Sequence, residues 1–422
     1  MSPHNENLSE EPDALAPNDH RRLGKELELF TFSDLVGSGL PLWLPKGATV
    51  RRVIERFVTD TEIAWGYNHV YTPDIAKLAL YKTSGHYPYY KDSMYAPIAI
   101  DEHEFMLRPM TCPHHFEVYA SRPRSYRELP MRIAELAKLY RYEGSGELSG
   151  LVRVRSFCLA DAHVICKDKE QAGDEIGKAL DLIEHISSVF GLKFGEDYWY
   201  RLSLGDRTNE EKYYKNDQAW EEGEALLREV LTKRKCKFTE ALDEAAFYGP
   251  KIDIQMKDAR GKENTAFTVQ YDFCMPDRFN LTFIDADGQE KRPLVVHRSS
   301  VGAIERVMAF LIEHYAGAFP TWIAPVQAIV LPVSEKHKSY AQDLLKKFSE
   351  SGIRTELDAS DESLGKRIRN AKLQKVPYLL VVGDKEVESQ TITLENREEG
   401  SLGALSIEKS TDVILQKIQS KK

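Results

Sequence analysis

The sequence predicts an α+β domain built on an antiparallel sheet, followed by a smaller α/β domain. Three observations predict this arrangement: apolar and polar residues alternate over 251–256, a hairpin pattern over 278–294 turns at Asp287-Gly288, and the rhythm changes after 319–322. Short turns between successive strands favour antiparallel pairing, because parallel strands need long crossover connections.

The chain opens with a polar, acidic stretch. Residues 1–19 include three prolines and too few apolar side chains to form a core, so we expect a disordered leader there. The next strong pattern is a long helix over 49–65, which leads into a strand that ends at Pro73. The apolar positions of this helix are Val53, Phe57 and Ile63.

Two domains follow from the remaining patterns. We expect the first to cover residues 20–323, with a further helix over 176–186 and a half-buried strand over 251–256. The second is expected over 324–422, where strands and helices alternate as in an α/β domain of roughly 100 residues. Its strands are expected at 328–333, 354–357 and 378–382, and its helices at 335–351 and 363–373.

The composition excludes several classes of protein. No apolar run approaches the ~20 residues that span a bilayer, so we expect no membrane partner. The start of the chain has no basic and apolar signal pattern, and five scattered cysteines do not make a disulfide framework, so we expect a cytoplasmic protein. The net charge of −9 decides little, because nucleic-acid binding needs only a local basic surface.

No glycine-rich phosphate loop and no dinucleotide fingerprint is present. Cys112, His163 and His297 are potential metal ligands, but they are 51 and 134 residues apart, and this spacing by itself indicates no site. Taken singly, each residue is more often a packed or surface side chain than a ligand. The segments around them carry more information.

Those segments are Leu107–His115, Arg153–His163 and Val296–Arg306. They resemble the class II aminoacyl-tRNA synthetases and, within this class, the threonyl-tRNA synthetases, over roughly residues 20–420. The helix and strand ending at Pro73 resemble motif 1, which implies a homodimer interface. Arg141-Tyr142-Glu143 with the loop 144–150 resembles motif 2, and Gly302 to Arg306 resembles motif 3.

The resemblance implies a ligase that joins L-threonine to tRNA(Thr) through a threonyl-adenylate, with Mg²⁺ and ATP. Charge spreads over phosphate oxygens in such a reaction, and arginine suits it because its planar fork binds phosphate bidentately. Arg141 is expected on the α-phosphate and the threonine carboxylate, and Arg153 and Arg306 towards the outer phosphates. Glu143 is expected on the adenine amino group and Phe157 under the adenine ring.

The resemblance also implies one zinc ion per subunit, held by Cys112, His163 and His297, with an open position for the amino and hydroxyl groups of threonine. Asp161 is expected to accept a hydrogen bond from that hydroxyl. A site built for a hydroxyl rejects valine strongly, whereas serine lacks only a methyl group and is rejected about 10–200-fold. Other residues that the resemblance places around the substrates are Tyr248, Lys251 and Gln270. It places His86 beside the terminal ribose of the tRNA, where it is expected to assist deprotonation of the attacking hydroxyl.

The second domain resembles the anticodon-binding domain of several class II enzymes. A basic run at helical spacing, which includes Arg367 and Arg369, would by itself usually be a solvated helix face. Beside the strand 378–382 it is expected to flank RNA, and Glu386 and Arg397 are expected to contact bases.

The sequence departs from the family pattern in two places. Leu159 stands where many members have a glutamine that holds the threonine carboxylate, so Arg141 is expected to supply that contact. Residues 1–19 are too short for the N-terminal module that hydrolyses mischarged seryl-tRNA. This leaves a natural short form, a piece excised from a longer chain, or a protein that relies on a separate editing factor.

Two rival functions remain open at this point. One is a class II synthetase for serine or proline, against which the three potential zinc ligands and Asp161 argue. The other is a non-enzymatic relative that has kept the fold, against which the presence of Arg141, Arg153 and Arg306 argues.

Overall fold

The structure, a computed structural model, describes residues 15–421, so that most of the expected leader lies outside the described residues. The chain forms two compact units. Unit 1 contains Phe32–Pro41 and Glu55–Ala309, and unit 2 contains the described residues up to Thr31, Leu42–Ile54 and the chain from Phe310 onward. The first helix, α1 (His20–Glu26), is capped by the side chain of Asp19.

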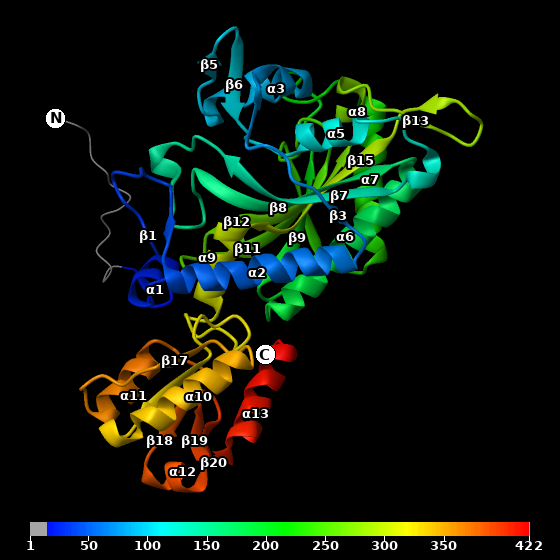
Figure 1. The fold of residues 1–422 in the computed structure, drawn as a ribbon. Coiled ribbons are helices and arrows are strands. Elements are labelled where there is room, and N and C mark those ends of the chain that lie inside the picture. Colours follow the sequence, from blue (N-terminus) through cyan, green and yellow to red (C-terminus); the bar gives the residue numbers. More distant parts are fainter. Residues whose placement is uncertain (1–14, 422) are drawn as a thin grey trace, which may run out of the picture. The chain divides into compact units, whose positions relative to one another are not determined.

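Unit 1 is built on an eight-stranded sheet with the order β10-β9-β11-β12-β15-β8-β7-β3 (Figure 1). All neighbouring strands are antiparallel except the two edge pairs, β10 with β9 and β3 with β7. The predicted antiparallel sheet is therefore confirmed. Its strands are β3 (Asn68–His69), β7 (Met131–Tyr140), β8 (Ser156–Cys166), β9 (Tyr198–Leu204), β10 (Phe238–Leu242), β11 (Lys251–Lys257), β12 (Glu263–Asp272) and β15 (Leu294–Ala303).

Amphipathic helices cover this sheet. The expected helix over 176–186 is α6 (Lys169–Val189), which starts at the capping side chain of Asp168 and packs its buried face against β8, β12 and β15. The expected helix over 49–65 is α2 (Pro45–Ala64). The other helices around the sheet are α3 (Leu78–Ser84), α4 (His86–Tyr89), α5 (Cys112–Ala120), α7 (Asp217–Lys233), α8 (Met275–Arg278) and α9 (Ile304–His314).

The strand predicted over 251–256 is present as β11, but it is not half-buried. Residues 252–256 are all buried, so both faces of β11 are covered. The polar member Asp253 is stabilised there by hydrogen bonds from Ser203 and Arg201. An alternating pattern therefore predicted the strand but not the covering of its second face.

Two smaller sheets complete unit 1. The hairpin predicted over 278–294 is confirmed as β13 (Phe283–Ile284) and β14 (Glu290–Lys291), with Gly288 at a positive φ of 79° in the turn. A three-stranded sheet is formed by β4 (Ile75–Lys77), β5 (Ile98–Ile100) and β6 (His103–Leu107).

The junction between β15 and α9 requires a glycine. The register of β15 against β8 slips between Ser299 and Ala303, and Gly302 adopts a positive φ of 71°. A Cβ atom at Gly302 would lie 2.1 Å from the carbonyl oxygen of Ala266, so no other residue fits there.

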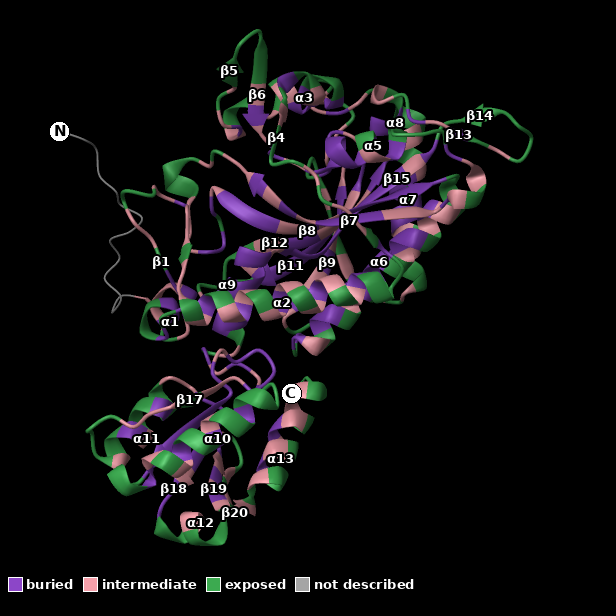
Figure 2. Ribbon diagram, viewed as in Figure 1, coloured by how far each residue is buried: buried purple, intermediate pink, exposed green. Residues whose placement is uncertain are grey.

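Unit 2 contains a five-stranded sheet with the order β17-β16-β18-β19-β20. Its hydrophobic core includes Val330, Leu344, Phe348, Leu380 and Ile414 (Figure 2). The predicted strands correspond to β16 (Ala328–Pro332), β17 (Thr355–Leu357) and β18 (Tyr378–Val382), and the predicted helices to α10 (Lys338–Glu350) and α11 (Leu364–Leu373). The structure adds β1 (Phe30–Thr31), β2 (Leu42–Trp43), β19 (Thr391–Asn396), β20 (Gly400–Ser406), α12 (Asp384–Ser389) and α13 (Ile407–Gln419). Within residues 15–421, no helix combines the length and apolarity needed to cross a bilayer.

Candidate active site

A cavity of about 480 Å³ lies on one face of the large sheet in unit 1. Side chains on alternate positions of a strand point to the same face, and β8 follows this rule. On β8 the odd positions Phe157, Leu159, Asp161 and His163 line the cavity. From β12, Ala266, Thr268 and Gln270 line the cavity, and Thr265 and Phe267 also reach it.

Strand register brings the two expected histidine ligands together. His163 on β8 pairs directly with His297 on β15, and their ring centroids are 4.5 Å apart. Cys112 is the first residue of α5, which packs against β8. One ligand atom each of Cys112, His163 and His297 lies within 4.8 Å of the others, and all three residues are buried. The structure therefore assembles the three residues that spacing alone could not connect.

The outer nitrogen of each histidine already has a partner. His297 Nε2 lies 2.7 Å from a carboxylate oxygen of Asp272. His163 Nδ1 lies 2.8 Å from His115 Nδ1, and His115 Nε2 lies 3.3 Å from a carboxylate oxygen of Glu135. Metal-bound histidines characteristically bind such a partner through their second nitrogen.

The protonation states fit a metal site. Burial lowers the pKa of His163 well below its ordinary value, so its imidazole is neutral and has a free lone pair. Burial, together with the carboxylates of Asp161 and Asp272, raises the pKa of the Cys112 thiol well above its usual range. A cation that displaces the thiol proton would reverse this shift. One sulfur and two imidazole nitrogens are a donor set that zinc favours, with a fourth position left open.

Asp161 lines the same cavity, two residues before His163 on β8. It pairs across the sheet with Glu135 on β7 and with Ser299 on β15. Burial raises the pKa of its carboxyl group, although the neighbouring imidazoles of His115 and His297 act in the opposite direction. Its position fits a hydrogen bond to a small polar group bound beside the three ligands.

Tyr248 closes this end of the cavity. Its ring stacks on His297 at 4.7 Å, and its hydroxyl donates a 2.6 Å hydrogen bond to the side-chain oxygen of Gln270. The amide nitrogen of Gln270 donates in turn to Thr268. Lys251 also lines the cavity, with its ammonium group 3.0 Å from Asp253. The residues expected around an amino acid are thus within one enclosure.

The other end of the cavity is basic. Arg141, directly after β7, has its guanidinium 5.2 Å from the ring centre of Phe157 and donates to the carbonyl of Pro109. Arg153 is exposed and pairs with Glu143, from its Nη2 atom at 2.8 Å. The structure brings all four residues to one place, with Glu143 bound to Arg153.

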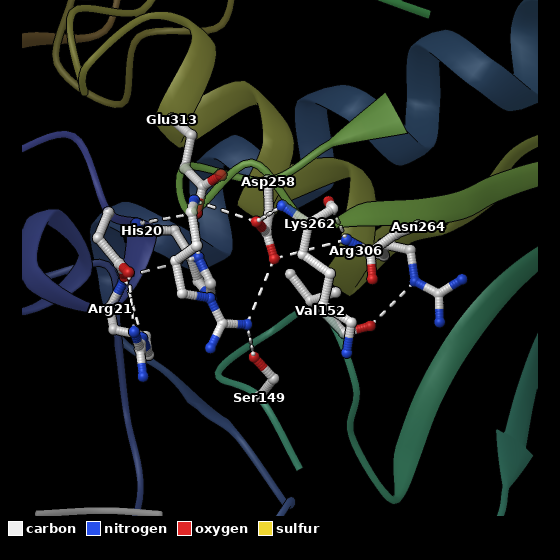
Figure 3. Close-up of polar contacts among 11 residues, drawn as sticks. His20, Arg21, Ser149, Val152, Asp258, Lys262, Asn264, Arg306 and Glu313 are labelled. Atoms are coloured by element: carbon white, nitrogen blue, oxygen red, sulfur yellow. Dashed lines mark hydrogen bonds and ion pairs between the residues drawn. The ribbon is translucent and has the colours of Figure 1, made fainter. Parts of the chain in front are cut away.

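Arg306 on α9 is the deepest cation at this end. Its guanidinium donates to the backbone carbonyls of Val152 and Thr265 at 2.9 and 2.5 Å, and Figure 3 shows it beside Val152. Burial and repulsion from Arg141 and Arg153 lower its pKa to about 10. It therefore stays charged at neutral pH, and a bound polyanion would relieve the repulsion among the three arginines.

His86 is fully buried at the cavity wall. Its Nδ1 lies 2.7 Å from the hydroxyl of Ser84, and its Nε2 lies 4.0 Å from the sulfur of Cys112. Burial, with repulsion from His297 and Arg141, lowers its pKa to about 3. Such a histidine is neutral but is a weak base.

The four residues expected to contact tRNA differ in their surroundings. Arg367 is buried, and its guanidinium donates to the carbonyls of Pro332, Asp358 and Glu362. Arg397 donates to the carbonyls of Ala318, Phe319 and Lys375, and the carboxylate of Glu386 binds Thr393 and the backbone of Gly383. These three side chains are held by the protein, whereas Arg369 is exposed on α11.

The sequence did not indicate Asp272, His115 or Glu135. Asp272 ends β12, two residues after Gln270, and only the pairing of β12 with β15 brings it to His297. His115 lies three residues after Cys112 on α5, and this helical spacing is the one local signal that could have indicated it.

Unit 2 contains a second buried group of potential ligands, Asp19, His20 and Glu313. Here the donors bind one another or a neighbour. His20 Nδ1 is 2.5 Å from Glu313 (Figure 3), and Asp19 accepts two side-chain hydrogen bonds from Arg21. Burial favours a higher pKa for Asp19, but the bonds from Arg21 outweigh it and lower the pKa.

Comparisons with known proteins match both units. Residues 95–315 match the tRNA synthetase class II core domain (G, H, P, S and T), and residues 327–417 match the anticodon binding domain. The threonine–tRNA ligase of Geobacillus kaustophilus is 49% identical over 405 residues, which are 96% of this chain and 62% of the relative. That of Staphylococcus aureus strain Newman is 49% identical over 93% of this chain and 60% of the relative. The chain thus spans about 62% of the length of such relatives.

Solved structures agree with this match. The RNA binding domain of threonyl-tRNA synthetase from Cryptosporidium parvum Iowa II superposes with a TM-score of 0.88 at 35% identity, covering 94% of this chain and 98% of that one. A putative threonyl-tRNA synthetase from Aeropyrum pernix gives a TM-score of 0.84 at 27% identity over 96% of each chain. The chain therefore belongs to the class II aminoacyl-tRNA synthetases and, within them, to the threonyl-tRNA synthetase family.

Proposed function

We propose that this protein is a threonine–tRNA ligase that forms threonyl-adenylate in the cavity of unit 1 and transfers the threonyl group to tRNA(Thr). One observation carries the proposal: Cys112, His163 and His297 converge at one end of a cavity whose other end holds Arg141, Arg153 and Arg306. A small polar ligand and a polyphosphate therefore fit in one enclosure.

In the first step, a carboxylate oxygen of threonine attacks the α-phosphorus of ATP, and pyrophosphate leaves. Arg141 holds the α-phosphate and the carboxylate, while Arg153 and Arg306 hold the outer phosphates with Mg²⁺. These cations line one cavity, so they can stabilise the charge that builds on the phosphate oxygens. Glu143 turns to the adenine amino group, and Phe157 stacks on the adenine once the guanidinium of Arg141 moves to the phosphate.

Cys112, His163 and His297 would hold the zinc ion. When bound, zinc supplies a Lewis-acidic open position for the amino and hydroxyl groups of threonine. Asp161 accepts a hydrogen bond from that hydroxyl, and Tyr248, Gln270 and Lys251 enclose the rest of the amino acid. Leu159 supplies no polar contact, so the carboxylate depends on Arg141.

This arrangement predicts the selectivity of the cavity. Valine carries a methyl group in place of the hydroxyl and leaves Asp161 without its partner, which costs a factor of about 10⁴ or more. Serine keeps the hydroxyl and loses one methyl group, so we expect discrimination of only about 10–200-fold. Correction of seryl-tRNA then requires a further activity, in a longer form of this protein or in a separate editing factor.

In the second step, a terminal ribose hydroxyl of the tRNA attacks the carbonyl carbon of the adenylate, the bond from this carbon to the phosphate oxygen breaks, and AMP leaves with the hydroxyl proton on its phosphate. His86 lines the cavity where this ribose would enter. With a pKa of about 3 it is a poor acceptor for the hydroxyl proton, so we assign it the orientation of the ribose by hydrogen bonding rather than general-base catalysis.

Amino-acid-dependent exchange of pyrophosphate into ATP tests the proposal. We expect exchange with threonine, weaker exchange with serine, exchange with valine near background, and loss of all three when a chelator removes zinc. Faster exchange with serine or proline than with threonine would favour the rival synthetase. Absence of any exchange, with zinc and Mg²⁺ present, would favour a non-enzymatic relative.

We also infer that unit 2 binds the anticodon of tRNA(Thr), because it matches the anticodon-binding domain and carries basic residues along α11. Arg369→Ala is expected to weaken tRNA charging a few-fold and to leave threonine-dependent pyrophosphate exchange unchanged. Arg367→Ala is the matched comparison on the same helix, and it is expected to lower the free energy of unfolding because three carbonyls lose their donor. Equal loss of charging by both variants through instability would contradict this assignment.

The motif 1 segment is proposed to form a homodimer. Tyr71 directly precedes Thr72 and is 95% exposed, and Leu35 is fully exposed, which is unusual for large apolar side chains. Tyr71→Asp is expected to shift the mass measured by light scattering from dimer to monomer.

Five free cysteines agree with a cytoplasmic location, which we also propose.

A further inference from the structure

Both histidines of the proposed zinc group are joined to a buried carboxylate from another element. Two separate chains of hydrogen bonds make these connections, one from Asp272 to His297 and one from Glu135 through His115 to His163. We propose that Asp272 and Glu135 are positioning residues that place the proton of each histidine on its outer nitrogen and leave the inner nitrogen free for zinc. This inference rests on the proposed zinc site.

The first chain of hydrogen bonds is short. Asp272 is fully buried and binds His297 through one carboxylate oxygen. Its other oxygen accepts from the backbone N–H groups of Cys274 and Met275 at 2.8 and 2.9 Å. An ionised carboxylate only accepts hydrogen bonds, so His297 must donate from Nε2, and Nδ1 keeps its lone pair.

The second chain of hydrogen bonds contains two histidines. One carboxylate oxygen of Glu135 accepts from Arg108 and from the backbone N–H of Thr72, and the other accepts from the hydroxyl of Thr72 at 2.7 Å and lies against His115 Nε2. If His115 donates from Nε2, its Nδ1 is an acceptor, and His163 must donate to it from Nδ1. The lone pair of His163 Nε2 is then free. The direction of every bond in this chain follows from the charge of Glu135.

Replacement of either carboxylate by its amide should reverse these directions with almost no change in shape. In Asp272→Asn, the two backbone N–H groups hold the amide oxygen, so the amide NH₂ must face His297 Nε2. In Glu135→Gln, the guanidinium of Arg108 and the backbone N–H of Thr72 hold the oxygen, so the NH₂ faces His115 Nε2 and the hydroxyl of Thr72, which can turn to accept. In each case the proton moves to the nitrogen that should bind the metal.

Zinc affinity of the full chain, measured by competition with a chromophoric chelator, tests the proposal without any activity assay. We expect D272N and E135Q each to weaken zinc binding about 10–100-fold, the range for loss of such outer partners. The control is Glu175→Gln, which changes a buried carboxylate that binds Arg132 at 2.5 and 2.8 Å. E175Q is expected to bind zinc as tightly as the wild-type protein.

A double-variant test separates proton placement from a general structural role. In His115→Asn the shorter amide can present its oxygen to His163 Nδ1 without reference to Glu135. Addition of E135Q to H115N should therefore change zinc affinity by less than about twofold, whereas E135Q alone changes it at least tenfold. The absorption of the cobalt-substituted protein reports the thiolate and imidazole ligands directly. It should therefore also change more when E135Q is made in the wild-type protein than when E135Q is added to H115N.

The outcomes are distinct. A wild-type chain that binds no zinc would overturn the zinc site and this inference together. A wild-type chain that binds zinc, with D272N and E135Q binding it as tightly, would overturn this inference alone. An equal loss caused by E135Q in the wild-type and H115N backgrounds would show that Glu135 acts only through packing.

Discussion

The two buried groups of potential metal ligands in this protein differ in how their atoms are used. In unit 2, His20 binds Glu313 and Asp19 binds Arg21, so the donors are occupied by protein partners. In unit 1, the outer nitrogens of His163 and His297 bind partners outside the group, and the inner atoms converge with Cys112. Proximity of ligand atoms is thus common to both groups, and what distinguishes a binding site is that those atoms remain available.

The largest expected effect is that of Cys112→Ser. We expect it to remove most of the zinc and to lower threonine-dependent pyrophosphate exchange about 100-fold or more, because serine lacks the thiolate that zinc favours. Metal analysis and the exchange assay check this, with far-UV circular dichroism to show that the fold persists. Cys166→Ser changes a buried cysteine at an even position of β8 and should leave zinc and exchange intact. Full activity of a zinc-free C112S protein would refute the site.

A disruption of the group formed by Asp19, His20 and Glu313 should lower stability without affecting zinc content or pyrophosphate exchange. His20→Ala leaves the buried carboxylate of Glu313 without the imidazole, which costs about 1–3 kcal/mol of unfolding free energy. Denaturant unfolding should detect this loss, and the zinc content and pyrophosphate exchange should equal those of the wild-type protein. Loss of zinc from H20A would mean that the contrast between the two groups is wrong.

Acid should lower the free energy of unfolding by protonating Glu135, which supports the group formed by Cys112, His163 and His297. Although burial acts to raise the pKa of this carboxyl, bonds from His115 and Thr72 and the charge of Arg108 bring it down to about 2, from an ordinary 4.5. A lowered folded-state pKa gives stability that is complete above pH 4.5 and is lost as the pH falls towards 2. The loss is up to about 3 kcal/mol. Unfolding of E135Q should depend less steeply on pH over this range, and parallel pH profiles would contradict the prediction.

The smallest expected effect concerns Leu159, which faces the cavity from β8 between Phe157 and Asp161. Leu159→Gln adds a donor where the threonine carboxylate is expected, and one hydrogen bond is worth about 0.5–1.5 kcal/mol. We therefore expect the KM for threonine to fall about 2–10-fold with kcat within twofold. Steady-state pyrophosphate exchange measures both constants. An unchanged or higher KM would show that Arg141 and the zinc ligands alone suffice at this end.

The sequence predicted those elements whose pattern is local. The helices α2 and α6 and the β13–β14 hairpin each carry their signal within about twenty residues, and the structure has all three. The covering of both faces of β11 could not be predicted, because it depends on what packs on each side of the sheet and not on the pattern of β11 itself.

The site shows the same limit. The family motifs indicated Cys112, His163 and His297, but the pairing of β8 with β15, which makes two of them neighbours, depends on the whole sheet. Asp272 and Glu135 act through contacts between elements, for which a single sequence gives no signal. The same holds for Arg367, since the carbonyls that bury it come from β16 and from the segment before α11.

The bulge at Gly302 has a consequence for any engineered length change. His297 at one end of the cavity and Arg306 at the other belong to a single continuous segment, β15 and α9, with Gly302 as its only sharp turn among the described residues 297–306. Insertion of one residue after Gly302 would rotate α9 by about 100° and advance it by about 1.5 Å. The guanidinium would then leave the carbonyls of Val152 and Thr265, although every functional side chain would still be present. The segment thus fixes the separation of His297 and Arg306, and its length in residues is part of the proposed site.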